Sequence, residues 1–153
     1  MRAGPVFQTL DVSRGAAFGD VDNDGDVDVV VANNNGKARL LINEVGARNH
    51  WVGLRLAGKA PPSSAGSGRS QPVEGRDMLG ARVAVLRDDG SALWRRARAD
   101  GSYASANDPR VLAGLGQSSK PVRVRVTWPG GATEEWGSVP ADRYTTLTEG
   151  SGK

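Results

Sequence analysis

Polar and apolar residues alternate most regularly over residues 122–128, where the sequence reads Val-Arg-Val-Arg-Val-Thr-Trp. A period of two places successive side chains on opposite faces, so this run predicts a half-buried β-strand. The Pro-Gly-Gly that follows predicts a turn into a second strand over residues 132–136. With a three-residue loop, the register sets Thr127 opposite Thr133 and Arg125 opposite Glu135, and both are favourable cross-strand pairs.

Shorter apolar runs, rich in valine and separated by Gly, Pro, Asn and Asp, predict further strands along the chain. These strands cover residues 14–18, 27–32, 38–42, 49–56, 81–85 and 144–147, with an edge strand or ordered lead-in over 5–12. A Gly-, Ser- and Pro-rich segment within residues 58–76 has no apolar pattern and predicts a flexible loop. The pattern therefore indicates an all-β protein, with a β-meander in residues 1–46 and a small antiparallel β-sandwich-like domain in residues 47–150.

Residues 91–99 are ambiguous, because their strong helix formers and a Ser that could cap them favour a helix. The Asp-Asp-Gly that precedes them predicts a hairpin turn and favours a strand instead. We predict the strand, which would place Trp94, Arg96 and Arg98 on one face.

Candidate chemistry is concentrated in residues 20–28, where five aspartates alternate along nine positions around one glycine. Carboxylates this close repel one another unless a cation compensates them. Their oxygen-only ligands favour Ca²⁺ over softer metals, and Gly25 permits the sharp turn that such a loop needs. The candidate ligands are Asp20, Asp22, Asp24, Asp26 and Asp28, with Asp26 able to contribute its main-chain oxygen.

An EF-hand is the main alternative for this loop, and the sequence argues against it. The twelfth position would be Val31, where an EF-hand requires a bidentate Glu. The β-branched residues after the loop favour a strand over the exiting helix of an EF-hand. The loop is therefore predicted to join two β-strands, and a solvated acidic turn is the simpler alternative to a metal site.

The net charge of +3 is unevenly distributed, since residues 1–36 carry −4 and residues 37–153 carry +7. A basic second half could attract an anionic polymer, although such arginines are more often the solvated faces of strands. The chain has no cysteine, so disulfides and thiolate metal sites are excluded. No apolar run approaches the length of a membrane span, and residues 1–30 lack the apolar core of a signal peptide.

Motifs for catalysis are absent from the sequence. It contains no Gly-x-Ser-x-Gly elbow, no His-Glu-x-x-His and no phosphate-binding glycine loop. His50 is the one histidine, and no motif presents a nucleophile to it. We therefore expect that the protein is not an enzyme.

Two groups of motifs carry a resemblance to known families. Ser-Arg-Gly-Ala-Ala-Phe-Gly-Asp over residues 13–20, with the acidic loop after it, resembles an FG-GAP (VCBS-type) repeat. The second group resembles the ASPIC/UnbV domain, as in the cartilage acidic protein family, and lies at residues 79–83, 101–103, 108–110, 114–116 and 128–131. The resemblance implies a Ca²⁺-binding blade of a β-propeller followed by a C-terminal β domain, and it implies a strand for residues 91–99. It also implies a secreted or cell-surface protein.

One repeat cannot close a propeller, which needs four or more blades. The chain is therefore expected to be the C-terminal portion of a longer protein or a truncated gene product, and unpaired edges of its first strands would favour self-association.

The leading hypothesis for function is a non-catalytic, calcium-binding module for extracellular recognition or adhesion, with an unidentified extracellular protein or glycan as its partner. The alternative is a carbohydrate- or matrix-polysaccharide-binding domain that uses Trp94, Arg95, Arg96 and Arg98. Nucleic-acid binding has the basic charge but lacks interleaved aromatic residues and any reading motif, so no nucleic-acid partner is expected.

Overall fold

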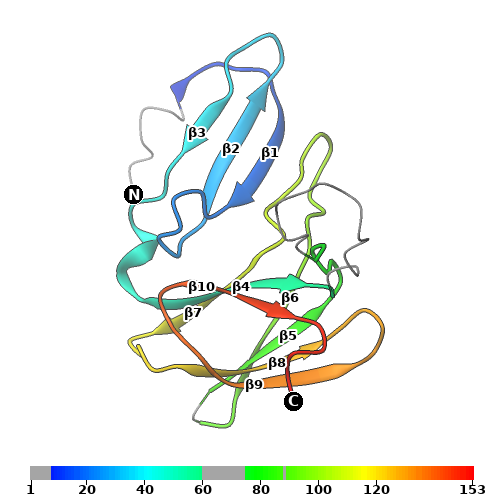
Figure 1. Cartoon of the computed structure of the whole chain (residues 1–153). Coiled ribbons are helices and arrows are strands. Elements are labelled where there is room, and N and C mark those ends of the chain that lie inside the picture. The colour runs from blue at the N-terminus through cyan, green and yellow to red at the C-terminus, as the bar shows by residue number, and fades with distance from the viewer. Residues whose placement is uncertain (1–7, 60–74, 88) are drawn as a thin grey trace, which may run out of the picture.

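The computed structural model describes residues 8–59, 75–87 and 89–153, and their strands form three sheets (Figure 1). Sheet A is antiparallel, with the order β1-β2-β3. Its strands are β1 (Ser13–Gly19), β2 (Asp28–Asn33) and β3 (Arg39–Leu41). A 3-10 turn, η2 (Gly46–Arg48), leads from sheet A into the rest of the chain. This part confirms the predicted meander of three strands.

Sheets B and C form the sandwich. Sheet B has the order β10-β4-β7 and consists of β10 (Tyr144–Thr148), β4 (His50–Ala57) and β7 (Val111–Gly116). Sheet C has the order β6-β5-β8-β9 and consists of β6 (Ala92–Arg96), β5 (Arg82–Leu86), β8 (Val122–Thr127) and β9 (Thr133–Val139). The strand β10 runs parallel to β4, whereas every other pairing in these two sheets is antiparallel. The all-β class is confirmed.

The hairpin of β8 and β9 has the register that the alternating sequence predicts. Thr127 pairs with Thr133, and Arg125 pairs with Glu135 through a 2.6 Å contact between Nε and Oε1. The tight turn between the strands brings the main-chain N–H of Gly131 within 2.9 Å of the Trp128 carbonyl.

The hydrophobic core lies between sheets B and C, where inward-facing residues of both sheets meet. Its buried members are Val52, Leu54, Leu56, Ala81, Val83, Val85, Ala97, Val111, Ala113, Val124, Val126, Trp128, Val139 and Leu147. Trp128 is almost fully buried, and its indole N–H donates to Glu134 Oε1 at 2.9 Å. Burial of these side chains supplies the main free energy that holds the sandwich together.

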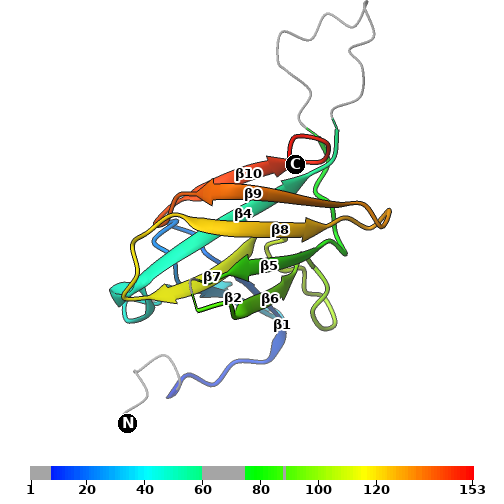
Figure 2. The same ribbon diagram turned by 90° about the horizontal axis from the view of Figure 1, so that it is seen from below.

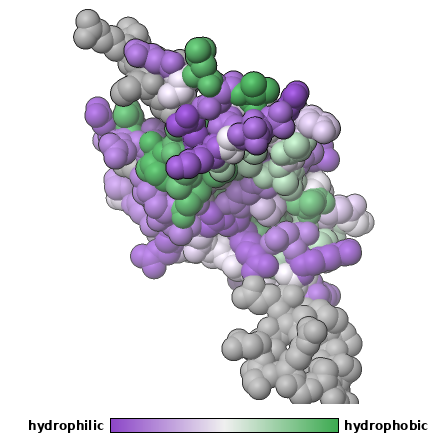
Figure 3. Space-filling view, turned by 90° about the horizontal axis from the view of Figure 1, so that it is seen from above, coloured by the Kyte–Doolittle hydropathy of each residue, from purple (hydrophilic) through white to green (hydrophobic). Residues whose placement is uncertain are grey.

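Sheet A contributes no residue to that core. Figure 3 views the molecule from the side of sheet A, and apolar side chains are exposed there among polar ones. The exposed apolar residues of sheet A and its flanks include Phe18, Val30, Leu40 and Ile42. Since no apolar layer formed by the described residues covers these side chains, sheet A is held mainly by its strand pairing and by polar contacts with the sandwich.

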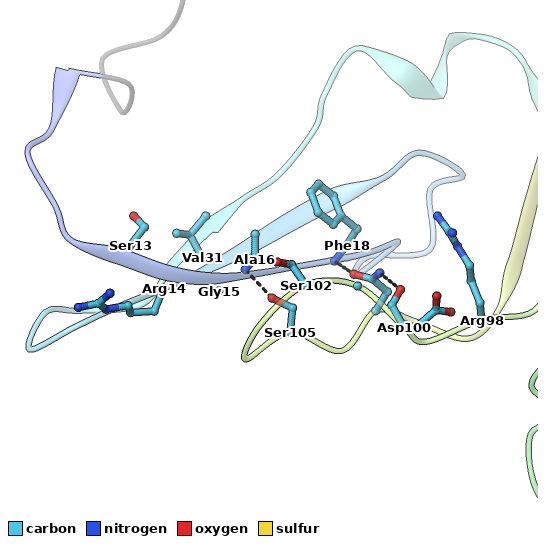
Figure 4. Close-up of a pocket in the computed structure, with 12 residues that line it drawn as sticks. Ser13, Arg14, Gly15, Ala16, Phe18, Val31, Arg98, Asp100, Ser102 and Ser105 are labelled. Atoms are coloured by element: carbon cyan, nitrogen blue, oxygen red, sulfur yellow. Dashed lines mark hydrogen bonds between the residues drawn. The ribbon is translucent and has the colours of Figure 1, made fainter.

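The outer edge of β1 is covered by the segment between β6 and β7 (Figure 4). The N–H of Ala16 donates to Ser105 Oγ at 3.0 Å, and the N–H of Phe18 donates to Asn107 Oδ1 at 3.0 Å. The Asp108 N–H donates to the Phe18 carbonyl at 2.9 Å. These contacts satisfy much of the β1 edge, so the prediction of self-association through an open strand edge now concerns β3, at the other side of sheet A.

The predicted lead-in over residues 5–12 is wrong as a strand for residues 8–12, which form no strand; residues 5–7 lie outside the described part. Two contacts join this segment to sheet A: the Asn34 N–H donates to the Val12 carbonyl at 2.8 Å, and Arg39 Nε pairs with Asp11 Oδ2 at 2.7 Å. Most of the predicted loop 58–76 also lies outside the described residues. Its ends are paired, because the Gly58 N–H donates to the Arg76 carbonyl at 2.9 Å.

Residues 91–99 form a strand, as predicted, although only over Ala92–Arg96. Pairing with β5 therefore outweighs the local helix propensity. Trp94 and Arg96 share one face, but the prediction that Arg98 lies with them on the strand is wrong, because β6 ends before Arg98. Within the described ranges, no helix is long and apolar enough to cross a membrane.

Candidate metal centre

The acidic loop runs from the end of β1 to the start of β2 and folds back on its first aspartate. Asn23 has φ 61° and Gly25 has φ 95°, so the main chain turns sharply at two points. Asp20 accepts hydrogen bonds from the N–H groups of Asp24 at 3.1 Å and Gly25 at 3.0 Å. These bonds give the loop its shape, because the Asp20 side chain supplies the acceptors that the turn itself lacks.

Asp28 ties the loop to the segment that follows β3. Its Oδ2 accepts from the Val21 N–H at 2.8 Å, and its Oδ1 accepts from the Asn43 N–H at 2.8 Å. The side chain is 1% exposed, which makes it the most buried carboxylate in the described structure. One buried carboxylate therefore joins two chain segments that are far apart in sequence.

Three of the predicted ligands converge. Carboxylate oxygens of Asp20, Asp22 and Asp28 all lie within 4.8 Å of one another. Calcium–oxygen distances are about 2.3–2.6 Å, so two oxygens on opposite sides of one Ca²⁺ lie roughly 4.6–5.2 Å apart. The observed spacing thus suits three oxygens that share one ion of this size.

The internal hydrogen bonds leave acceptor capacity on the two buried carboxylates. A carboxylate has about four lone-pair sites. Asp20 also accepts from the Tyr144 hydroxyl at 2.9 Å, so its donors are the N–H groups of Asp24 and Gly25 and the Tyr144 hydroxyl. Asp28 has two donors. Both side chains can therefore bind a cation without losing the hydrogen bonds that shape the loop.

The other two predicted ligands lie differently. Asp24 Oδ1 accepts from the Asp26 N–H at 3.1 Å, and its carboxylate is not part of the converging group. The buried Asp26 side chain lies against Gly46, where an added Cβ would meet the Asp26 Cβ at 2.5 Å. The structure thus brings together Asp20, Asp22 and Asp28, and sets the Asp24 and Asp26 carboxylates beside that group.

The electrostatics of the loop follow from its crowding. Partial desolvation, together with the negative charges of Asp24 and Asp28, raises the pKa of Asp22. None of Asp20, Asp22 and Asp28 forms an ion pair with a Lys, Arg or His side chain of the described residues. Arg110 interacts with Asp20 electrostatically but makes no ion-pair contact with the three carboxylates. A hard cation fits this donor set, because it would compensate most of their negative charge.

Arg110 anchors the loop to the sandwich. Its guanidinium donates to the main-chain oxygen of Asp20 at 2.7 Å and to Asn23 Oδ1 at 2.7 Å. It also pairs with Asp108, and this hydrogen bond is the main cause that raises the Arg110 pKa. The guanidinium carbon lies 4.0 Å from the centre of the Tyr144 ring. One side chain just before β7 therefore organises the loop, and its charge also interacts favourably with Asp20.

Two aromatic residues of sheet B form the platform beneath the loop. Trp51 and Tyr144 pack at 5.2 Å between ring centres. A Cβ at Gly25 would overlap the Trp51 indole, so the loop approaches the platform at its glycine. Burial is the main cause that raises the pKa of Tyr144, and its hydrogen bond to Asp20 adds to the effect. The Tyr144 hydroxyl therefore stays protonated and donates to Asp20 at any ordinary pH.

Sequence reasoning missed these anchors, since nothing local to Arg110, Tyr144 or Trp51 indicates a role at a loop about 30 to 120 residues away. A weak signal existed at Arg110, which lies in one of the motifs that resemble the ASPIC/UnbV domain.

The remaining candidate residues lie away from the loop centre. His50 Nδ1 lies 2.7 Å from Asp142 Oδ2 at an exposed position. Arg95, Arg96 and Arg98 line a cleft of about 350 Å³, together with Asp20 and Val27 of the acidic loop. Trp94 is 52% exposed on the outer face of sheet C.

Comparison with known proteins supports part of the resemblance. Residues 71–153, more than half of the chain, match the sequence profile of the family described as ASPIC and UnbV. The matched segment includes Arg110 and Tyr144 but not the acidic loop. No curated protein matches the chain.

Proposed function

Because the chain belongs to the ASPIC and UnbV family, and because its acidic loop is docked on the family domain, we propose that it is a calcium-binding, non-catalytic recognition module. The observation that carries the proposal is the convergence of three carboxylates within 4.8 Å without an ion-pair partner among the described residues. The FG-GAP-type repeat and the location at the cell surface or outside the cell belong to this proposal.

Asp20, Asp22 and Asp28 would hold the ion, with Asp24 and the Asp26 main-chain oxygen as the further ligands that the sequence suggests. A bound Ca²⁺ would supply positive charge to the clustered carboxylates and so remove their mutual repulsion. We expect affinity in the weak range of extracellular modules, about 10⁻⁴–10⁻³ M.

Residues of the loop would couple calcium binding to the ordering of sheet A. Asp20 fixes the end of β1 and the turn, while Asp28 fixes the start of β2 and the segment after β3. Arg110 and Tyr144 hold Asp20 against the sandwich. Sheet A contributes no residue to the hydrophobic core. The free energy of calcium binding at the loop would therefore stabilise the docking of sheet A on the sandwich.

A recognition role is supported by the surface of sheet A. Several large apolar side chains are exposed there, and exposed apolar patches are typical of interaction sites. The module is proposed as the C-terminal portion of a larger repeat protein, in which neighbouring repeats would share that surface.

Thermal unfolding of the whole chain in EDTA and in 10 mM CaCl₂ tests the proposal. With a Kd of about 10⁻⁴ M, 10 mM calcium stabilises by about 2.7 kcal/mol, which corresponds to roughly 5–10 °C in Tm for a chain of this size. MgCl₂ at the same concentration serves as the control for ionic strength and ion selectivity. Equal melting temperatures in EDTA and calcium would refute calcium binding by this chain.

The substitution Asp22→Asn should give opposite effects in the two conditions. In EDTA it removes repulsion within the loop, so the Tm should equal or exceed that of the wild type. In calcium it removes a ligand, so most of the calcium-dependent rise should disappear. Asp100→Asn is the matched control, because it removes one negative charge at an exposed position outside the loop. A full calcium response in Asp22→Asn would exclude Asp22 as a ligand.

A further inference from the structure

The outer face of sheet C is basic, and the strand register explains why. Arg82 lies opposite Arg96 on β6 and opposite Thr127 on β8. In the next row, Ala84 lies between Trp94 and Arg125. Arg123 follows in the third row, opposite Leu86. Figure 2 views the molecule from the side of these strands, away from sheet A.

Carboxylates do not balance the charges on this face. Arg125 and Arg123 share one partner, Glu135, at 2.6 and 3.3 Å. In the described part of the chain, Arg82 and Arg96 have no carboxylate partner at all. This sheet face therefore carries four arginines, and one carboxylate, Glu135, pairs with two of them.

The pairing of Arg82 with Arg96 is unfavourable for the isolated protein. Like charges directly opposite each other on neighbouring strands destabilise a sheet. Among the described residues, the attractive contact of Arg82 is with the Trp94 ring, whose centre lies 5.3 Å from the guanidinium carbon. An external anion would compensate both guanidinium groups.

Shape and composition indicate the kind of anion. The arginines occupy three neighbouring strands, about 10 Å apart from first to last and about 13 Å along the strands, so one small anion cannot reach them all. Trp94 is 52% exposed among them and provides an apolar surface of the kind on which a sugar ring packs. Surfaces for single-stranded nucleic acid instead stack successive bases on several aromatic side chains. Trp94 is the one aromatic residue facing out from the described strands of this sheet.

From these observations we propose that the outer face of sheet C binds a linear sulfated polysaccharide, with Arg82, Arg96, Arg123 and Arg125 as sulfate contacts and Trp94 as a platform for a sugar ring. This assignment changes the residue set that the sequence predicts. Arg95 pairs with buried Val83 and so points to the other face, and Arg98 lies beyond the strand.

Heparin, a linear sulfated polysaccharide, is the probe. Calorimetric titration of the whole chain at 50, 100 and 200 mM NaCl should give a Kd that rises steeply with salt. The double variant Arg82→Gln/Arg96→Gln should bind at least tenfold more weakly at 100 mM NaCl. Its slope of log Kd against log [NaCl] should fall by about two, one for each lost contact. Its Tm should not fall, because the substitution removes a like-charge pair.

The matched control is Arg14→Gln/Arg48→Gln, which lowers the net charge by the same amount at exposed positions in and beside sheet A. This control should retain heparin affinity within about twofold. Equal losses in both double variants would overturn the proposal, because binding would then follow net charge alone. Equal or tighter binding of a single-stranded oligonucleotide of matched charge would also overturn it.

The proposal does not depend on calcium. The acidic loop packs on the aromatic platform of sheet B, and among the proposed contacts Arg96 alone also lines the cleft beside that loop. Heparin affinity should therefore be the same in EDTA and in calcium. The heparin titration therefore tests the sheet C proposal even if the melting experiments show no calcium binding.

Discussion

Replacement of Asp28 by alanine is expected to destabilise the protein by about 2–4 kcal/mol in EDTA and to abolish its response to calcium. The buried carboxylate accepts from the N–H groups of Val21 and Asn43, both at 2.8 Å. Alanine leaves both donors without an acceptor, at a cost of about 1–3 kcal/mol each, and part of this cost is offset by relief of repulsion in the loop. Guanidinium unfolding, followed by tryptophan fluorescence, measures the loss.

The isosteric variant Asp28→Asn separates structure from charge. It keeps one oxygen acceptor and the shape of the side chain, so its stability in EDTA should lie closer to the wild type than that of Asp28→Ala. It should nevertheless lose the calcium response. A calcium response that survives in both variants would contradict the assignment of Asp28 as a ligand.

The substitution Gly25→Ala is expected to cost about 3–5 kcal/mol, from a strained main chain and from overlap with Trp51. Gly25 has φ 95°, a conformation that side chains other than glycine rarely adopt, and its added Cβ would overlap the indole. The loop should then separate from the Trp51 and Tyr144 platform. Fluorescence of the tryptophans should change in the native baseline, and the calcium-dependent rise in Tm should fall or disappear.

Gly137→Ala is the control for this prediction. Gly137 lies in β9, its Cβ would meet nothing within 4 Å, and its φ is not in the left-handed region. The change should stay within about 0.5 kcal/mol of the wild type. A Gly25→Ala variant as stable as Gly137→Ala would show that close contact between the loop and Trp51 is not needed for the fold.

The sequence predicted those parts of the fold that depend on local pattern. Alternation over residues 122–128 placed β8 correctly, and the short turn after it set the register of Thr127 with Thr133. The hairpin turn before residue 92 indicated a strand where the composition favoured a helix. In these cases neighbours along the chain are also neighbours in the sheet, so local pattern is sufficient.

Long-range pairings were beyond that reasoning. The parallel pair of β4 and β10 joins residues about 90 positions apart, and no turn between them sets a register. The strand β7 was not predicted, because two glycines among its six residues weaken the strand pattern.

In the candidate site too, local features were predicted from the sequence and long-range contacts were not. Spacing of the aspartates and the position of Gly25 indicated the loop from sequence, and Asp20, Asp22 and Asp28 do converge. The residues that hold the loop in place, above all Arg110, come from distant strands and carry no local signal. On the outer face of sheet C, the sequence pointed to Arg96 but not to Arg82, because only the pairing of β5 with β6 brings the two together.

The central claim is that an ion at the acidic loop orders sheet A against the sandwich. Amide hydrogen exchange of the whole chain, measured by mass spectrometry in EDTA and in 10 mM calcium, tests it most directly. Calcium should slow exchange in peptides that cover residues 13–33 and 39–43, while peptides from residues 122–139 in sheet C should exchange at the same rate in both conditions. Unchanged exchange throughout residues 13–43 at saturating calcium would contradict the claim.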